Sequence, residues 1–340
     1  MSFSNPRRGS LCLLLLLVAG RAGAWHLAQE VKIPGDGGWD YLAFDGVAQR
    51  IFVSHGTRVD VIDARKLTVV GAVDDTPGVH GIALAQELGR GYVSAGGSGS
   101  VVVFDLKTLA RVTEIKVTGE NPDAILYEPS TRRVFTFNGR GRNVTVIGAT
   151  DNQVLATIDV DAKPEFAVTD GAGHVFVNLE DRNSVAEIDA AAMKVLHTWP
   201  MEGCEEPSGL AFDVKHRRLF SVCGNRVMMV VDSTDGHVLA RLPIGQGVDG
   251  AGFDPGRQMA FASCGDGTLT VVRERNAQKF EVMASVATRR GARTMTLDPV
   301  SHRVYLSTAQ RGPAPPPSAA EPRPRAPVIP GTFALLVIEP

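Results

Sequence analysis

One short apolar segment recurs seven times along the chain, and this recurrence constrains the fold more than any other feature. The second residue of the segment falls at positions 52, 92, 135, 176, 220, 260 and 305, so the copies are 40 to 45 residues apart. A period of this length is typical of one four-stranded blade per repeat. The seven copies are IFVSHG, GYVSAG, VFTFNG, VFVNLE, LFSVCG, MAFASC and VYLSTA.

Each repeat contains the same parts in the same order. An apolar strand with a glycine or proline lead-in, such as PSGLAFD, precedes the recurring segment, and a third and a fourth strand, such as RVDVID and HVLARLPI, follow it. These short runs are rich in β-branched residues and are bounded by Gly, Pro, Asp and Asn, as strands are. We therefore predict an all-β fold, a seven-bladed β-propeller of four-stranded antiparallel blades, forming one domain over residues 25–340.

The ring is expected to close through the two ends of the chain. The seventh repeat contains three strands, near Thr294, Val304 and Phe333, and an unassigned strand from His26 to Ile33 precedes the first repeat. Pairing this amino-terminal strand with Phe333 to Ile338 completes the last blade. It also removes two exposed sheet edges, which promote association in open β-structures.

The repeat unit PSGLAFDVKHRRLFSVCGNRVMMVVDSTDGHVLARLPI resembles the YVTN-repeat, YncE-like family of exported bacterial β-propellers, whose repeats are related to WD40 repeats. The resemblance covers nearly all of the chain after residue 24. It implies the propeller fold and leaves the activity open, because propellers carry many unrelated functions.

The first 24 residues have the pattern of a cleavable secretory signal. Arg7 and Arg8 form a basic head, Leu11 to Val18 an apolar core, and Ala22 to Ala24 a small-residue exit. The apolar run is too short to span a bilayer. We expect cleavage after Ala24 and a periplasmic or secreted protein without a membrane span.

The charge balance argues against a nucleic-acid partner. The whole chain has 35 Lys and Arg against 37 Asp and Glu, and three of the arginines lie in the signal segment, which has no acid. The mature chain is therefore mildly acidic and has no basic tract that would bind phosphate backbones.

One residue per repeat stands at the entrance of the first strand. Because the first strands surround the axis of a propeller, we expect these side chains to converge on one mouth of the central channel, here called the top mouth. The residues are Asp40, His80, Asp123, Glu165, Ser208, Asp249 and Arg293.

The top mouth is interpreted as a ligand-binding site, with no catalytic residue assigned. A divalent metal ion held by His80, Asp123, Glu165 and Asp249 is one hypothesis, and a water-filled funnel balanced by Arg293 is the alternative. Trp39 and His55 are included as rim residues that would contact a ligand, whereas Tyr41 is expected to pack between blades.

Three cysteines lie in the mature chain. Cys204, before the first strand of the fifth repeat, and Cys223, at the end of its second strand, are expected on the same face, so we predict a disulfide between them. Cys264 would then be free. The alternative is that these sulfurs join His80 or His55 on a soft metal ion.

Other conspicuous residues are interpreted as structural. Nine aspartates that end first or third strands are expected to fix turns on the opposite, bottom face, and His174, His216 and His302 are expected at turns there. Residues 311–330 contain eight prolines and are predicted to form an extended or disordered loop on the top face. A lid or docking arm is one hypothesis for this loop, and a mobile insertion without a role is the alternative.

Two functions follow from these features. The first is an exported binding or interaction module that uses the top mouth for a small molecule or a periplasmic protein. The second is a metal-dependent hydrolase of lactone or ester type, with His80 as proton carrier. The sequence contains no Gly-x-Ser-x-Gly elbow, no phosphate-binding glycine loop and no Cys-x-x-Cys-His haem motif.

Overall fold

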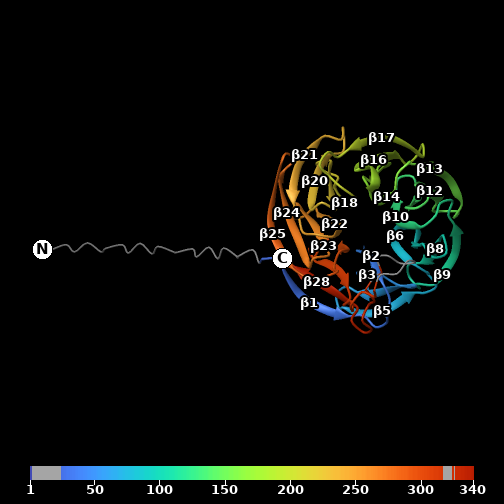
Figure 1. Ribbon diagram of the computed structural model, residues 1–340, viewed down its shortest axis with the longest axis horizontal. Coiled ribbons are helices and arrows are strands. Elements are labelled where there is room, and N and C mark those ends of the chain that lie inside the picture. Colours follow the sequence, from blue (N-terminus) through green and yellow to red (C-terminus); the bar gives the residue numbers. More distant parts are fainter. Residues whose placement is uncertain (2–23, 317–323, 325) are drawn as a thin grey trace.

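Seven four-stranded antiparallel sheets surround a central channel in the computed structural model (Figure 1). The structure describes residues 1, 24–316, 324 and 326–340. The predicted fold class, a seven-bladed all-β propeller, is confirmed. The predicted signal segment lies almost entirely outside the described residues.

The first strand of each blade lies beside the channel and contacts the first strands of the two neighbouring blades. These innermost strands are β2 Trp39–Asp45, β6 Val79–Ala85, β10 Pro122–Glu128, β14 Pro164–Thr169, β18 Pro207–Asp213, β22 Val248–Asp254 and β26 Met295–Leu297. The second strands are the seven recurring segments of the sequence. They are β3 Arg50–His55, β7 Arg90–Ala95, β11 Arg133–Asn138, β15 His174–Leu179, β19 Arg218–Cys223, β23 Met259–Cys264 and β27 Val304–Thr308.

The third and fourth strands continue each sheet outward. The third strands are β4 Arg58–Asp63, β8 Ser100–Asp105, β12 Asn143–Gly148, β16 Ser184–Asp189, β20 Val227–Asp232, β24 Thr268–Asn276 and β28 Ala334–Glu339. The outermost strands are β5 Thr68–Val73, β9 Arg111–Lys116, β13 Val154–Asp159, β17 Lys194–Pro200, β21 Val238–Pro243, β25 Lys279–Ala287 and β1 His26–Lys32.

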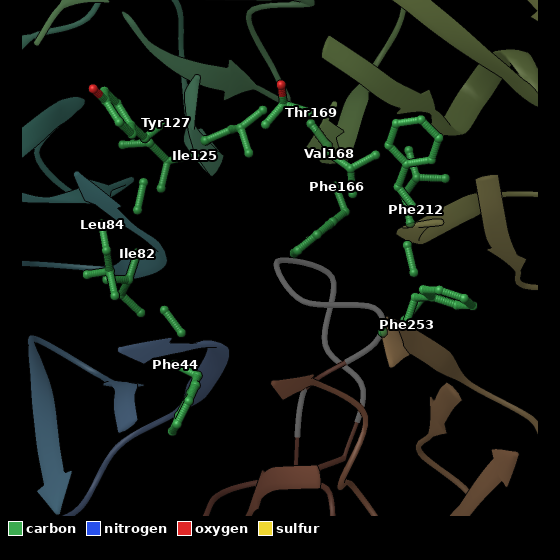
Figure 2. Close-up of a pocket in the computed structure, with 18 residues that line it drawn as sticks. Phe44, Ile82, Leu84, Ile125, Tyr127, Phe166, Val168, Thr169, Phe212 and Phe253 are labelled. Carbon is green, nitrogen blue, oxygen red and sulfur yellow. The ribbon is translucent and has the colours of Figure 1, made fainter. Parts of the chain in front are cut away.

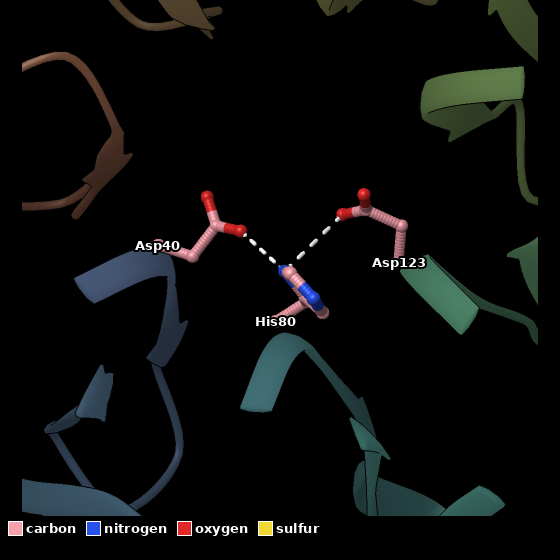
Figure 3. Close-up of side chains that lie close together, drawn as sticks. All are labelled: Asp40, His80 and Asp123. Atoms are coloured by element: carbon pink, nitrogen blue, oxygen red, sulfur yellow. Dashed lines mark hydrogen bonds and ion pairs between the residues drawn. The ribbon is translucent and has the colours of Figure 1, made fainter. Parts of the chain in front are cut away.

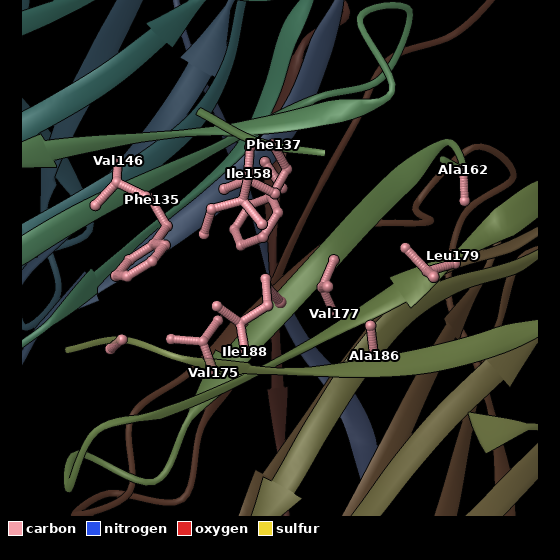
Figure 4. Close-up of a cluster of buried hydrophobic side chains, with 14 of the residues drawn as sticks. Phe135, Phe137, Val146, Ile158, Ala162, Val175, Val177, Leu179, Ala186 and Ile188 are labelled. Carbon is pink, nitrogen blue, oxygen red and sulfur yellow. The ribbon is translucent and has the colours of Figure 1, made fainter. Parts of the chain in front are cut away.

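The core lies between neighbouring blades. Phe135 and Phe137 of β11 face Val175 and Val177 of β15 across one such interface, and all four side chains are fully buried (Figure 4). Both faces of a blade are covered in this way, so the middle strands are continuous apolar runs rather than alternating ones. Each large side chain that is buried there contributes about 1.5–3 kcal/mol to stability.

Aspartates end many strands on the bottom face and fix the turns that follow them. In each case a carboxylate oxygen accepts a hydrogen bond from a backbone N–H group two to four residues later, which confirms the structural role predicted for them. The nine residues are Asp45, Asp63, Asp105, Asp170, Asp189, Asp213, Asp232, Asp254 and Asp298.

The two ends of the chain close the ring, as predicted. Strand β1 pairs antiparallel with β28, with His26 opposite Glu339 and Lys32 opposite Ala334. In Figure 1 β1 lies outermost in the blade that also contains β28. The backbone N–H of Ile33 continues the ladder by donating to the carbonyl of Phe333 at 2.9 Å.

The described ends of the proline-rich segment pair with each other. Arg311 and Val328 form an antiparallel bridge, and the Gly312 N–H donates to the Pro327 carbonyl at 2.9 Å. The described ends of the segment therefore lie side by side between β27 and β28. Residues 317–323 and 325, within the segment 311–330 for which a lid or docking arm is one hypothesis, lie outside the described residues.

Helical structure in the described part of the chain is limited to two three-residue 3-10 turns, η1 Gln86–Leu88 and η2 Glu180–Arg182. Within the same residues, none of the helices has the length and apolar character needed to cross a bilayer.

Removal of β1 is expected to destabilise the whole ring. A chain that begins at Pro34 leaves β28 as an unpaired edge, so we expect a lower denaturation midpoint and concentration-dependent association. Chemical denaturation and light scattering measure the two effects. The matched control begins at Trp25 and keeps β1. Equal stability of the two chains would contradict the assigned closure.

Candidate functional site

A backbone bulge places the predicted residues at the top mouth. In the first six blades the register between the first and second strands shifts near the start of the first strand. In blade one, Trp39 opposes His55 and Leu42 opposes Val53, so Asp40 and Tyr41 together oppose Ser54. A bulge of this kind re-aims side chains at the end of a sheet.

Buried hydroxyl and amide groups hold the mouth backbone in place across blade boundaries. In four blades, the carbonyl of the mouth residue accepts a hydrogen bond from a side chain of the preceding blade. Because these donors are buried, a donor left without its carbonyl acceptor would lower the free energy of unfolding by about 1–3 kcal/mol. The four pairs are Ser94 to Asp123, Asn178 to Ser208, Ser263 to Arg293 and Thr294 to Asp40.

Three of the predicted residues contact one another on blades one to three. His80 Nδ1 lies 2.7 Å from Asp40 Oδ2, with which it shares a hydrogen bond, and 3.6 Å from Asp123 Oδ1. Figure 3 shows both carboxylates pointing toward the imidazole. The three ligand atoms lie within 4.8 Å of one another, so one cation could contact all three.

The other predicted residues have partners of their own. Arg293 Nη1 lies 3.1 Å from Asp249 Oδ2, and Glu165 Oε1 lies 2.6 Å from Lys163 Nζ. Lys163 also contacts Glu180, and Ser208 Oγ donates to the Val248 carbonyl at 3.3 Å. The four metal ligands predicted from the sequence therefore do not form one group. His80 and Asp123 lie together with Asp40, whereas Glu165 and Asp249 have other partners.

Sequence reasoning did not single out Lys163. It directly precedes the strand β14, two residues before the aligned entrance residue Glu165. A basic residue two positions from an entrance acid is the signal that would have found it.

The carboxyl groups of the mouth repel one another and are shielded from solvent. Burial raises the pKa of Asp249 to about 7, with the charges of Asp40 and Asp123 adding to the effect and Arg293 opposing it. Burial likewise raises the pKa of Asp123 to about 6, against the influence of His80. These charges act across blade boundaries, so the predicted residues form one electrostatic unit.

The charge state of His80 follows from the same surroundings. Burial alone would lower the pKa of His80, but the hydrogen bond to Asp40 and the charge of Asp123 raise it above its usual value. The imidazole is therefore biased toward its positive form while it lies between the two carboxylates.

Two aromatic rings meet across the channel below the mouth. Tyr41 of blade one and Phe166 of blade four meet with ring centroids 5.3 Å apart, and Tyr41 is 7% exposed. Tyr41 packs against another blade, as expected, and its ring reaches across the axis to blade four rather than to a neighbouring blade. The same position holds small residues in the other blades, which leaves room for two rings. These are Gly81, Ala124, Gly209, Gly250 and Thr294.

The glycines at this position are required by a close approach of neighbouring first strands. A Cβ atom on Gly209 would lie 2.6 Å from the Asp249 carbonyl oxygen of the next blade. A larger residue there would force the blades apart.

Beyond the two rings, the bottom half of the channel is apolar. A cavity of about 480 Å³ is lined by side chains of the first strands, including Phe44, Phe212 and Phe253 (Figure 2). The two ends of the channel therefore differ, because charged groups line the top and aromatic and aliphatic groups line the bottom.

Trp39 and His55 are involved in packing at the closure between blades one and seven. Trp39 is 8% exposed and donates through Nε1 to the Gly291 carbonyl at 3.3 Å. His55 is 3% exposed, stacks on Phe333 with centroids 4.1 Å apart, and shares a hydrogen bond with Asp60 at 2.7 Å. Both side chains lie apart from the Asp40, His80 and Asp123 contacts.

The cysteines do not form a metal site with these histidines. Cys204 and Cys223 form a disulfide within blade five, with Cα atoms 5.5 Å apart, and Cys264 is free and buried. Burial raises the pKa of the Cys264 thiol to about 11, so the thiolate that a metal requires is disfavoured.

No family model and no curated protein matches this chain. Solved structures do match it. The chain is similar to hydrazine synthase of Kuenenia stuttgartiensis, with 18% identity and a TM-score of 0.69 over 81% of this chain and 94% of that one. It is similar to the WD40 repeats of RRP9, with 7% identity and a TM-score of 0.77 over 93% and 99%. At such identities the likeness establishes the fold, and the chain is a seven-bladed β-propeller protein.

The mouth acids predict how stability depends on pH. The pKa of Asp249 is higher in the folded chain than the ordinary value near 4, so the folded state holds its proton to higher pH. The stabilisation that proton binding by Asp249 gives the folded state is therefore lost as pH rises from about 4 to about 7. We expect Asp249→Asn to raise the melting temperature at pH 8 and to flatten the profile between pH 4 and 8.

Asp63 is the control of opposite sign for this experiment. The backbone N–H of Lys66 lowers the pKa of Asp63, so its contribution is present above about pH 4 and is lost below. Asp63→Asn should therefore lower the melting temperature at pH 8. An unchanged profile in Asp249→Asn would contradict the assigned electrostatics of the mouth.

The disulfide is expected to stabilise blade five. The two cysteines are 19 residues apart, and closing a loop of that length stabilises a protein by about 3 kcal/mol. Dithiothreitol should lower the free energy of unfolding of the natural chain by this amount. The Cys204→Ala/Cys223→Ala variant should be equally unstable with and without reductant, whereas a response in that variant would assign the effect to another group.

Proposed function

We propose that this protein is an exported binding module of the YVTN-repeat, YncE-like kind, which holds a small positively charged ligand at its top mouth. The carboxylate excess at this mouth carries the proposal. Five carboxyl groups meet there with His80 and two permanently positive side chains, Lys163 and Arg293. The five are Asp40, Asp123, Glu165, Glu180 and Asp249.

The raised pKa values of Asp123 and Asp249 support a cationic ligand. They mean that the folded chain takes up protons because the charged carboxylates are buried, with the charges of neighbouring carboxylates adding to the effect. A bound cation would relieve the same repulsion without protonation, so binding should be favoured by the charge that the protein already concentrates there.

The positive charge could belong to a divalent metal ion or to an organic amine. Asp40, His80 and Asp123 offer a metal ion two carboxylate oxygens and one imidazole nitrogen. An amine would instead donate hydrogen bonds to the same oxygens. The contact of Tyr41 with Phe166 across the axis favours a small ligand over a protein segment threaded through the channel.

Export is proposed from two independent features. The first 24 residues have the order of basic, apolar and small residues of a secretory signal. The Cys204 and Cys223 disulfide supports an oxidising compartment. The metal-dependent hydrolase stays a prediction, since it requires an ion at this mouth in addition to a bound ester.

Binding to the mouth is tested by calorimetry with residues 25–340. Mn²⁺, Ca²⁺ and the diamine 1,4-diaminobutane are titrated separately, so that a metal ion is distinguished from an organic cation. We expect one of the two classes to bind with one equivalent at the top mouth. The Asp40→Asn/Asp123→Asn variant should lose that equivalent.

The matched control is Glu281→Gln, which removes one exposed carboxylate that pairs with Arg275 outside the channel. It should bind as the natural chain does. Absence of binding by all three probes, or undiminished binding in the double variant, would overturn the proposal.

A further inference from the structure

A second cluster of metal-binding side chains lies on the bottom face, between blades five and six. Asp213 ends β18, His216 lies in the turn before β19, and Glu274 lies near the end of β24 in the next blade. His216 Nδ1 is 2.7 Å from Asp213 Oδ2 and 3.0 Å from Glu274 Oε1. The sequence had assigned His216 to a surface turn, and the structure adds two carboxylates from different strands.

The contacts in this cluster differ from the other close contacts between histidines and carboxylates in the described chain. Apart from the 3.6 Å contact of His80 with Asp123, the others have the geometry of hydrogen bonds, and His302 with Asp254 on the same face is an example at 2.8 Å. Neither contact of His216 has that geometry. Asp213 Oδ2, His216 Nδ1 and both carboxylate oxygens of Glu274 are buried and receive no hydrogen bond from any described residue.

Such a group of buried polar atoms is costly unless something else satisfies it. Glu274 is 1% exposed, and Asp213 is 3% exposed. The nearby Arg218 is committed elsewhere, to Asp232 at 2.7 Å and to the Ala277 carbonyl at 2.8 Å. The imidazole nitrogen and the carboxylate oxygens converge within ion-pair distance but without the geometry of hydrogen bonds, as ligand atoms around a metal ion do.

The fold itself does not require a carboxylate at position 274. Equivalent positions are recognised by a backbone hydrogen bond that six blades share. In each of them, the residue equivalent to Glu274 donates its backbone N–H to the carbonyl of the residue just before the second strand. The side chain is small or apolar in the five other blades. Those residues are Ala64, Leu106, Ala149, Ala190 and Ser233.

Electrostatics agree with this reading. Asp213 and Glu274 place two buried carboxylates in contact with the same imidazole. A divalent cation would offset the repulsion between the two carboxylates. The cluster also borders a cavity of about 720 Å³ at the bottom of the channel, whose lining includes Asp213 and Lys215.

We propose that Asp213, His216 and Glu274 bind a divalent first-row transition-metal ion, such as Zn²⁺ or Mn²⁺, between blades five and six. One imidazole nitrogen with carboxylate oxygens suits these ions, whereas Ca²⁺ and Mg²⁺ prefer oxygen ligands alone. Because the ligands come from two blades, the ion stabilises their interface as well as the turn that carries His216. This site is separate from the top mouth.

Metal binding is tested on residues 25–340 with Zn²⁺ and Mn²⁺ as probes, by elemental analysis after dialysis and by thermal denaturation. The test variant is Glu274→Ala, which restores the residue found at this position in three other blades. It should fold, and it should be at least as stable as the natural chain without metal. We expect the natural chain to gain melting temperature with at least one of the two ions, and the variant to lose both that gain and the bound ion.

His216→Ala serves as a second variant, because the matching turn of blade one, from Asp45 to Arg50, has Ala48 at that position. It should also lose the ion. His302→Gln and Asp123→Asn are controls for the hydrogen-bonded histidine on the same face and for the top mouth, and both should keep it. The proposal fails if the natural chain binds neither ion, or if binding survives Glu274→Ala and His216→Ala and is lost in Asp123→Asn.

Discussion

Closure of the ring by β1 and β28 is the constraint on which the other features of this protein depend. Each blade buries its faces against two neighbours, so a missing contact at one boundary exposes apolar surface on two sheets. The pairing joins residues that are more than 300 positions apart, from His26 to Glu339. The hydrogen bond from Thr294 to the Asp40 carbonyl makes the same connection beside the channel.

The closed ring explains why charges accumulate at one mouth. The bulge at the start of the first strands aims one side chain per blade at the axis, and the buried hydroxyl and amide groups of the second strands hold that backbone rigidly. Acids at these positions lie close together and are shielded from solvent, so burial raises their pKa values and the charges of neighbouring carboxylates add to the effect. The cation-binding proposal depends on this enforced proximity.

Much of the fold could be predicted from the repeat, and part of the site followed from it. The strand order, the closure and the entrance residues Asp40, His80 and Asp123 all came from aligning repeats about 40 residues long, because equivalent positions in a propeller have equivalent surroundings. The partners of individual residues did not follow. Lys163 beside Glu165, Tyr41 against Phe166 and Glu274 beside His216 each depend on side-chain direction and on which blades face each other.

The sequence by itself determined the number of blades, their four-strand pattern and the strand that closes the ring, because apolar periodicity and turn residues act within each repeat. Only the tertiary structure decided how the ionisable residues combine. A bulge turns Asp40 toward His80, small residues at five positions admit two rings into the channel, and a blade boundary brings Glu274 to His216. These contacts join residues from separate repeats, so their distances are determined by how the blades pack around the axis.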